Sequence, residues 1–274
     1  MSRSGNSWAV IGLLAIAAVG GLTFYWYYEA SLEPAAAPTA EPPEPAEVRR
    51  RPGPIYPLEP IATGEDTARN LVPLPTLDDS DGYFRLELVN IYGNRLDELL
   101  GREALIEKFV ATIDNLPRSH VAERLRPVGS IAGPFLVETD GDVTIISPEN
   151  FKRYAFLADL VVNADMDAIE DVYRRYYPLF QQAYVALGYP NGYFNDRVVE
   201  VIDHLLATPS PAEPLQLSRP HVLYELADPD LEALSSGQKL LLRMGDSNAT
   251  KVKDALARLR KRIAVPASEG DGAG

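Results

Sequence analysis

The residues of this chain whose types and spacing could do chemistry gather between positions 193 and 204. Asp196, Glu200 and His204 are four residues apart, so on a helix they would share one face. Two carboxylates beside an imidazole can act as general acid and base on a glycan or peptide bond. These three are the candidate catalytic residues. The candidate binding residues beside them are Tyr193, Asn195 and Arg197.

The same stretch also has a purely structural interpretation, which the sequence leaves open. Asn195 and Asp196 can occupy the start of a helix, where polar side chains accept from unpaired backbone N–H groups. Glu200 can pair with His204 one turn later on the exposed face. Because no cleft or perturbed pKa can be seen in a sequence, the pattern favours this interpretation over catalysis.

Composition excludes several other kinds of site. The chain has no Cys and only three His, none at metal-ligand spacing, so we expect no metal and no thiolate chemistry. No glycine-rich phosphate loop or Gly-x-Ser-x-Gly motif is present, and no cofactor is expected. The net charge of −13 argues against nucleic acid as a partner, since phosphate binding requires a basic surface.

Aromatic residues form a second pattern just before this stretch. Tyr173, Tyr177, Phe180 and Tyr184 recur at helical spacing. If exposed, this tyrosine stripe could stack on sugar rings or bind a partner. If buried, it is the core-facing side of a helix, which is the commoner reason for such spacing. We expect it to be core.

The N-terminal part of the chain has the pattern of a membrane anchor. Residues 8–28 carry no charge and as a helix would be about 31 Å long, close to the hydrocarbon thickness of a bilayer. The run is longer than the apolar core of a signal peptide and ends in bulky aromatics, so we expect it to stay uncleaved. Arg3 precedes it and Glu29 follows it. The positive-inside rule places residues 1–7 in the cytoplasm and the rest outside, in the periplasm if the membrane is a bacterial inner membrane.

Two further regions follow the anchor. Residues 29–75 are rich in Pro, Ala and Glu and poor in large apolar residues, which predicts a disordered linker without a core. Residues 76–265 form one mostly helical (α+β) domain, and 266–274 a disordered tail. A β-hairpin is expected around Asp140-Gly141, with a short edge strand at 222–226. Helices are expected near 84–91, 102–116, 148–162, 166–187 (kinked or split at Pro178), 191–206, 230–244 and 247–263.

Several long motifs resemble domain-of-unknown-function family 3014, a group of membrane-anchored proteobacterial proteins. The motifs are LPTLDDSD (74–81), FVATIDNLPR (109–118), PENFKRY (148–154), YYPLFQQAY (176–184), GYPNGYFNDRVVEVIDHLL (188–206) and SGQKLLLRMG (236–245). The resemblance implies a proteobacterial source and the same plan of anchor, linker and domain. It implies no activity and no catalytic residue.

Two functions from different classes are consistent with these patterns. The first is a single-pass inner-membrane protein whose tethered periplasmic domain binds an envelope protein as an adaptor or assembly factor. The alternative is a peptidoglycan hydrolase or glycan-binding module that uses residues 193–204. The sequence favours binding over an enzyme.

Overall fold

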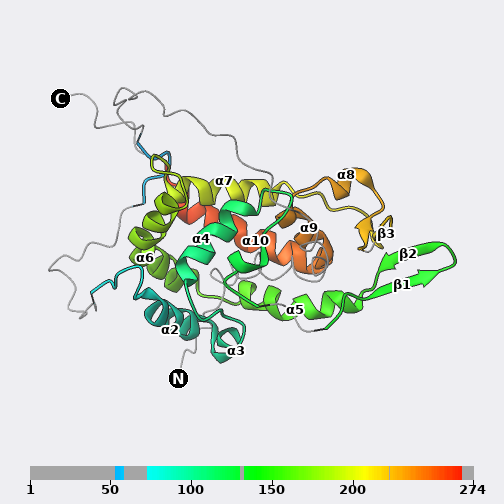
Figure 1. Cartoon of the computed structure of the whole chain (residues 1–274), viewed down its shortest axis with the longest axis horizontal. Coiled ribbons are helices and arrows are strands. Elements are labelled where there is room, and N and C mark those ends of the chain that lie inside the picture. Colours follow the sequence, from blue (N-terminus) through cyan, green and yellow to red (C-terminus); the bar gives the residue numbers. More distant parts are fainter. Residues whose placement is uncertain (1–52, 59–72, 130–132, 222, 267–274) are drawn as a thin grey trace, which may run out of the picture.

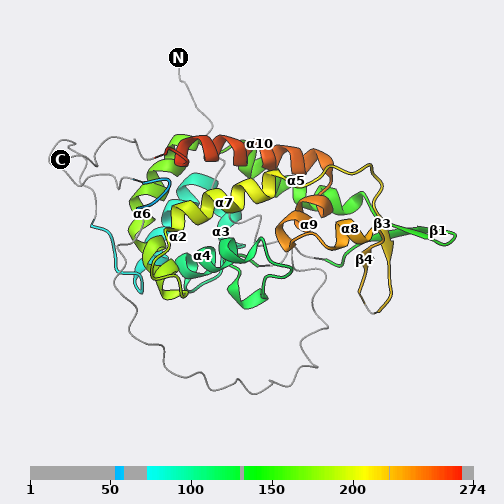
Figure 2. The ribbon, with the colours of Figure 1, turned by 90° about the horizontal axis from the view of Figure 1, so that it is seen from above.

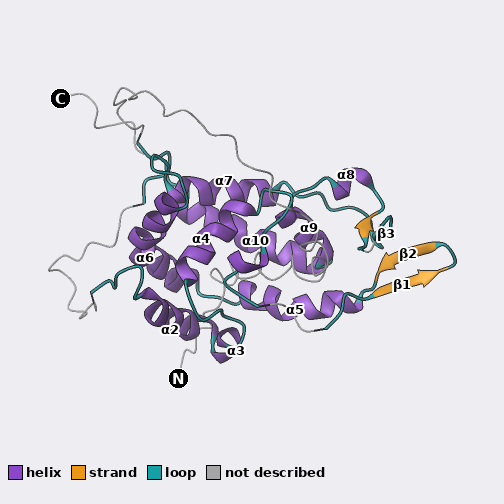
Figure 3. Ribbon diagram, in the orientation of Figure 1, coloured by secondary structure: helices purple, strands orange, loops and turns teal. Residues whose placement is uncertain are grey.

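The computed structural model describes residues 53–58, 73–129, 133–221 and 223–266. These residues form helices and one small sheet, which confirms the predicted mostly helical α+β class (Figure 3). The helices are α2 (Ser80–Tyr92), α3 (Asn94–Asp97), α4 (Leu105–Asn115), α5 (Glu149–Val162), α6 (Met166–Ala186), α7 (Phe194–Leu206), α8 (Pro229–Glu232), α9 (Ser236–Arg243) and α10 (Asp246–Ile263), with a 3-10 turn η1 (Glu123–Leu125).

The helices enclose one large apolar core. Helix α10 packs against α5 and α7 along one face of the molecule, while α4 packs against α2, α6 and α7 (Figures 1 and 2). At the α6 end, Phe84 contacts the rings of Phe109, Tyr176 and Phe180 with centroids 5.2–5.7 Å apart. Such edge-on and tilted aromatic contacts add to the free energy gained by burial. This end of the bundle also carries the candidate site.

The predicted helix boundaries hold for most elements, with two exceptions. Pro178 neither splits nor ends the helix expected at 166–187, because α6 is continuous and buries Tyr176, Leu179 and Phe180 on both sides of the proline. The single helix expected at 230–244 is wrong, since α8 and α9 are separate. Ser235 explains the break: its side chain and that of Gln238 form a reciprocal capping box that begins α9.

A small antiparallel sheet lies beyond the far end of the bundle (Figures 1 and 2). The predicted hairpin is confirmed, with Gly141 at positive φ in its turn. Strand β3 was not predicted, and β4 lies at the sheet edge, as Pro220 before it indicated. A separate cluster of apolar side chains packs between the sheet and α9. The strands, in sheet order, are β1 (Val137–Asp140), β2 (Val143–Ile146), β3 (Gln216–Ser218) and β4 (Glu225–Leu226).

Part of the predicted linker packs on the domain. In the segment 53–58, Leu58 is only 8% exposed and belongs to the main core, and Tyr56 packs against that core. The expectation that nothing within 29–75 enters a core is therefore corrected for these six residues. Three large apolar side chains within four positions (Ile55, Tyr56 and Leu58) distinguish this segment from the Pro, Ala and Glu around it.

The predicted membrane anchor, residues 8–28, lies outside the described residues, as do most of the linker and the end of the tail. Among the helices of the described part, none is both long enough and apolar enough to cross a bilayer.

Candidate functional site

Four of the six candidate residues lie in the first turns of α7, and their side chains join this helix to segment 53–58, α4, α6 and α10. Asn195 is completely buried. Its Nδ2 donates to the carbonyl oxygens of Tyr56 and Ile263, both at 2.9 Å, and its Oδ1 accepts from the Tyr173 hydroxyl at 3.1 Å. Asn195 thus joins segment 53–58, the end of α10 and helix α6 at one point.

Asp196 does not act on its own helix as a cap. Its two carboxylate oxygens accept from the backbone N–H groups of Ile55, at 3.0 Å, and Tyr56, at 2.8 Å. Hydrogen bonds to a charged carboxylate are stronger than neutral ones, and this pair fixes two successive peptide units. Asp196, a candidate for acid–base chemistry, therefore binds the main chain of a distant segment.

Arg197 joins α7 to α4. Its Nε donates to Oδ1 of Asp114 at 2.9 Å and its Nη2 donates to the Asp114 carbonyl at 2.7 Å. Asp114 is buried and its Oδ2 also accepts from Arg118 and from the Tyr189 hydroxyl. Glu200, with a side chain 68% exposed, lies 2.9 Å from Nη1 of Arg197. The predicted pairing of Glu200 with His204 is therefore replaced by pairing with Arg197.

His204 contacts the beginning of α9. Its Nε2 lies 2.8 Å from the Ser235 hydroxyl, the same oxygen that accepts from the Gln238 N–H in the capping box. Burial, and then the positive charge of Arg197, lower the pKa of His204. A lowered pKa favours the neutral ring, which suits an uncharged contact between two helices.

The three candidate acid–base residues thus lie on one helix, but their side chains contact three different groups. Asp196 faces segment 53–58, Glu200 pairs with Arg197 near solvent, and His204 faces α9. Tyr193 is half-buried at the residue that precedes α7. The described residues contain no group of three His, Cys, Asp or Glu side chains that could hold a metal ion.

The tyrosine stripe is core, as predicted. Tyr173, Phe180 and Tyr184 are each less than 8% exposed, while Tyr177 is partly buried and packs against them. Tyr184 stacks on Tyr189 with ring centroids 4.6 Å apart. Burial, and then the charge of Asp114, raise the pKa of Tyr184 to about 12, so its phenol is uncharged below pH 10.

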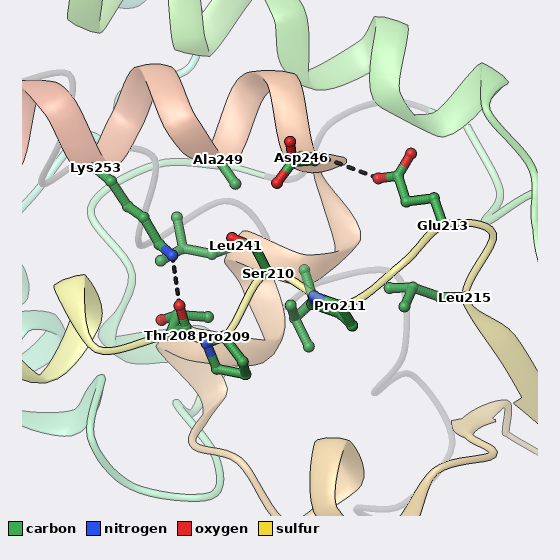
Figure 4. A pocket seen from close by; sticks show the side chains of 11 residues that line it. Thr208, Pro209, Ser210, Pro211, Glu213, Leu215, Leu241, Asp246, Ala249 and Lys253 are labelled. Carbon is green, nitrogen blue, oxygen red and sulfur yellow. Dashed lines mark hydrogen bonds between the residues drawn. The ribbon is translucent and has the colours of Figure 1, made fainter.

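A recess of about 290 Å3, part of it open solvent, lies at the opposite end of α7 (Figure 4). Lys253 at its wall donates to the carbonyl of Thr208, and Glu213 accepts from the Asp246 N–H at 2.9 Å. These two charged side chains are thus held by the wall itself. None of the six candidate residues lines this recess.

Sequence reasoning missed the residues that complete the site: segment 53–58, Asp114 and Ser235. Only the first carried a local signal, the three large apolar side chains in a Pro-rich region. The partners of Asp196 lie 140 and 141 residues away, and those of Arg197 in α4 lie 83 residues away. No periodicity connects positions so distant.

The class of protein that these features define is a helical α+β domain that binds an N-terminal segment of its own chain at the start of α7. The chain belongs to the family of proteins of unknown function DUF3014, which matches residues 105–260. That range contains helices α4 to α9, most of α10, and all six candidate residues. No curated protein and no solved structure matches the chain.

Proposed function

We propose that this protein is a membrane-tethered binding module, an adaptor or assembly factor of the bacterial envelope. Residues 8–28 anchor it in the inner membrane, residues 1–7 lie in the cytoplasm, and the domain lies in the periplasm. The observation that carries the binding role is that Asp196 and Asn195 hold the main chain of residues 55–56. Polar groups at the start of α7 recognise a polypeptide segment in this structure.

The alternative, a peptidoglycan hydrolase or glycan-binding module, requires Asp196, Glu200 and His204 to face one substrate. Each of these side chains instead has a partner in a different element. Paired carboxylates in glycosidases face each other across the scissile bond at roughly 5–10 Å. The alternative remains a prediction that no contact among the described residues favours.

The binding role is tested by photo-crosslinking in cells. A photoreactive phenylalanine derivative at Tyr193, the residue that precedes α7, is expected to give a discrete crosslink to one envelope protein. The crosslink is expected to weaken strongly with Asp196→Asn and to persist with Glu200→Gln, which alters the same helix on its exposed side. The same derivative at Tyr83, an exposed residue of α2, serves as the positional control. Crosslinks that are identical from both positions would contradict the proposal.

The anchor makes a prediction of its own. We expect the full chain to stay in membranes on alkaline extraction, because about 20 uncharged residues suffice to span the hydrocarbon core. A reporter that is active only outside the cytoplasm, fused after Val265, is expected to be active. Deletion of residues 8–28 is the control and is expected to release the protein and silence the reporter. Full-length protein in the soluble fraction would show that the segment is no anchor.

A further inference from the structure

Segment 53–58 packs on the domain as a bound peptide ligand would, and we call the surface that it covers, which includes Asn195 and Asp196 of α7 and Arg260 of α10, the groove. Its residues form no helix or strand, and their burial alternates: Pro54, Tyr56 and Leu58 face the domain, while Gly53, Ile55 and Pro57 are exposed. Alternating burial of this kind lets one face of a peptide fill pockets while the other faces solvent. Ile55, for example, is 64% exposed.

The groove contacts both the main chain and the side chains of this segment. Two N–H groups and one carbonyl, all from residues 55 and 56, are bonded to the first turn of α7. Leu58 enters the main core, and the Tyr56 side chain interacts with the Arg260 guanidinium. The segment lies beside the C-terminal end of α10 and the adjacent ends of α6 and α7 in both ribbon views (Figures 1 and 2).

The two prolines fit this mode of recognition. Pro54 and Pro57 lack an N–H, so the segment presents few donors besides the two that Asp196 accepts. Each proline also fixes its own φ, which lowers the entropy lost when the peptide binds. The groove is thus matched to a short chain in which tyrosine and leucine face the domain, proline stands two positions before and one position after the tyrosine, and the residue directly before the tyrosine contributes only its N–H.

We propose that this groove is a recognition site for a partner polypeptide carrying a Pro–x–Tyr–Pro–Leu segment, in which x is any residue with a free N–H, and that residues 53–58 occupy it until such a partner arrives. The inference rests on the proposed binding function and names the ligand class of its site. Residues 59–72, only 14 positions, separate the bound segment from the start of the described domain at 73. A tether this short gives an effective concentration on the order of millimolar.

The tether sets the size of the expected competition. For a groove with an intrinsic Kd of about 10–100 μM, a resident segment at millimolar effective concentration weakens the apparent affinity for a free peptide about 10- to 100-fold. Removing the resident segment from the groove should raise the apparent affinity for the free peptide by the same 10- to 100-fold. The measurement is therefore a comparison of two full-length chains with the same free peptide.

The test uses a fluorescein-labelled peptide of residues 52–60 and anisotropy titration of the full chain. The double variant Tyr56→Ala/Leu58→Ala removes the two largest of the three side chains that face the domain and vacates the groove. We expect it to bind the peptide at least tenfold more tightly than the wild-type chain does. Adding Asp196→Asn is expected to abolish this gain, because an amide offers only one acceptor to the two N–H groups. Adding Glu200→Gln instead is expected to leave it unchanged.

A second vacated variant guards against misfolding of the first. Ile55→Pro removes one of the two N–H groups that Asp196 accepts, while the side chain it replaces is exposed and Leu58 stays intact. It is expected to show the same direction of change, and the far-UV circular dichroism spectrum of the helical domain is expected to match that of the wild type. Equal affinity for wild-type and vacated chains, or no binding to either vacated chain, would overturn the inference.

Three further outcomes distinguish a second copy of this chain from another partner, and the proposed function from the present inference. A wild-type dimer that Asp196→Asn dissociates, seen by light scattering, would assign the groove to a second copy of this chain and overturn the partner assignment. Peptide binding without a crosslink in cells would preserve the ligand class and contradict the adaptor role. A crosslink without peptide binding would preserve the adaptor role and overturn this inference.

Discussion

Replacement of Tyr184 by alanine is expected to lower the free energy of unfolding by about 3–5 kcal/mol, the cost of deleting a buried aromatic ring. The ring is 6% exposed, stacks on Tyr189 and contacts Phe194 with centroids 5.6 Å apart. Gly192 lies so close that a Cβ there would be 2.9 Å from the Tyr184 ring. A site packed this tightly from three directions cannot collapse around the cavity.

The expected loss is large enough to measure by either heat or denaturant. For a domain of this size, about 3–5 kcal/mol corresponds to a fall in Tm of roughly 6–20 °C. Val185→Ala is the matched control, because Val185 is the next residue of the same helix and is 40% exposed. Its effect should stay within about 0.5 kcal/mol.

A Tyr184→Ala chain that melts like the wild type would contradict the core assignment of the tyrosine stripe. Tyr184→Phe distinguishes the ring from the hydroxyl, since it keeps the packing and removes only the phenol. We expect most of the stability to return with phenylalanine. The Tm is therefore expected to be highest for the wild type, slightly lower for Tyr184→Phe and much lower for Tyr184→Ala.

The parts of the fold that the sequence predicted are those encoded by local patterns. Apolar residues at helical spacing place α4, α5, α7 and α10 within a few residues of their observed bounds, because one periodic face of each enters the core. The hairpin followed from Asp140-Gly141 between β-branched residues. The tyrosine stripe was identified as core for the same reason. Each of these signals lies within about 20 residues of chain.

The parts that the sequence did not predict depend on contacts between distant segments. A Pro-rich stretch such as 53–58 has no local reason to pack, and only its contacts with Asn195 and Asp196 of α7 and with Arg260 of α10 give it one. The division of 230–244 into α8 and α9 depends on whether Ser235 caps, which propensity alone does not decide. Strand β3 is three residues long and pairs with Thr144 and Ile145 of β2, far from it in sequence.

The candidate site shows the same limit in its chemistry. The sequence selected Asn195, Asp196 and Arg197 because polar groups gather at the start of a helix with an apolar face. All three are central to the contacts of that region. Their roles could not be assigned, because a carboxylate facing two backbone N–H groups and one facing a substrate look identical in sequence. What a polar side chain does depends on the group that packs against it.

The buried carboxylate of Asp114 provides the second large prediction. Asp114→Asn is expected to destabilise the domain by about 3 kcal/mol, the lower part of the range for removing one partner of a buried ion pair. The lower value applies because the Arg197 side chain retains 17% exposure and keeps its bonds to the Asp114 carbonyl and to Glu200. The loss is measured by urea unfolding at constant pH.

Glu200→Gln is the matched control for Asp114→Asn, because it removes the other carboxylate that faces the same guanidinium. The Glu200 side chain is 68% exposed and that of Asp114 only 2%, so solvent screens the first pair and not the second. We expect the control to cost less than about 1 kcal/mol. Similar losses of stability in the two variants would mean that either carboxylate holds Arg197 equally well. The contact of Asp114 with Arg197, between α4 and α7, would then not be the main support of this site. A loss confined to Asp114→Asn would instead identify that contact as the support that keeps the first turn of α7, with Asn195 and Asp196, in place to hold a peptide.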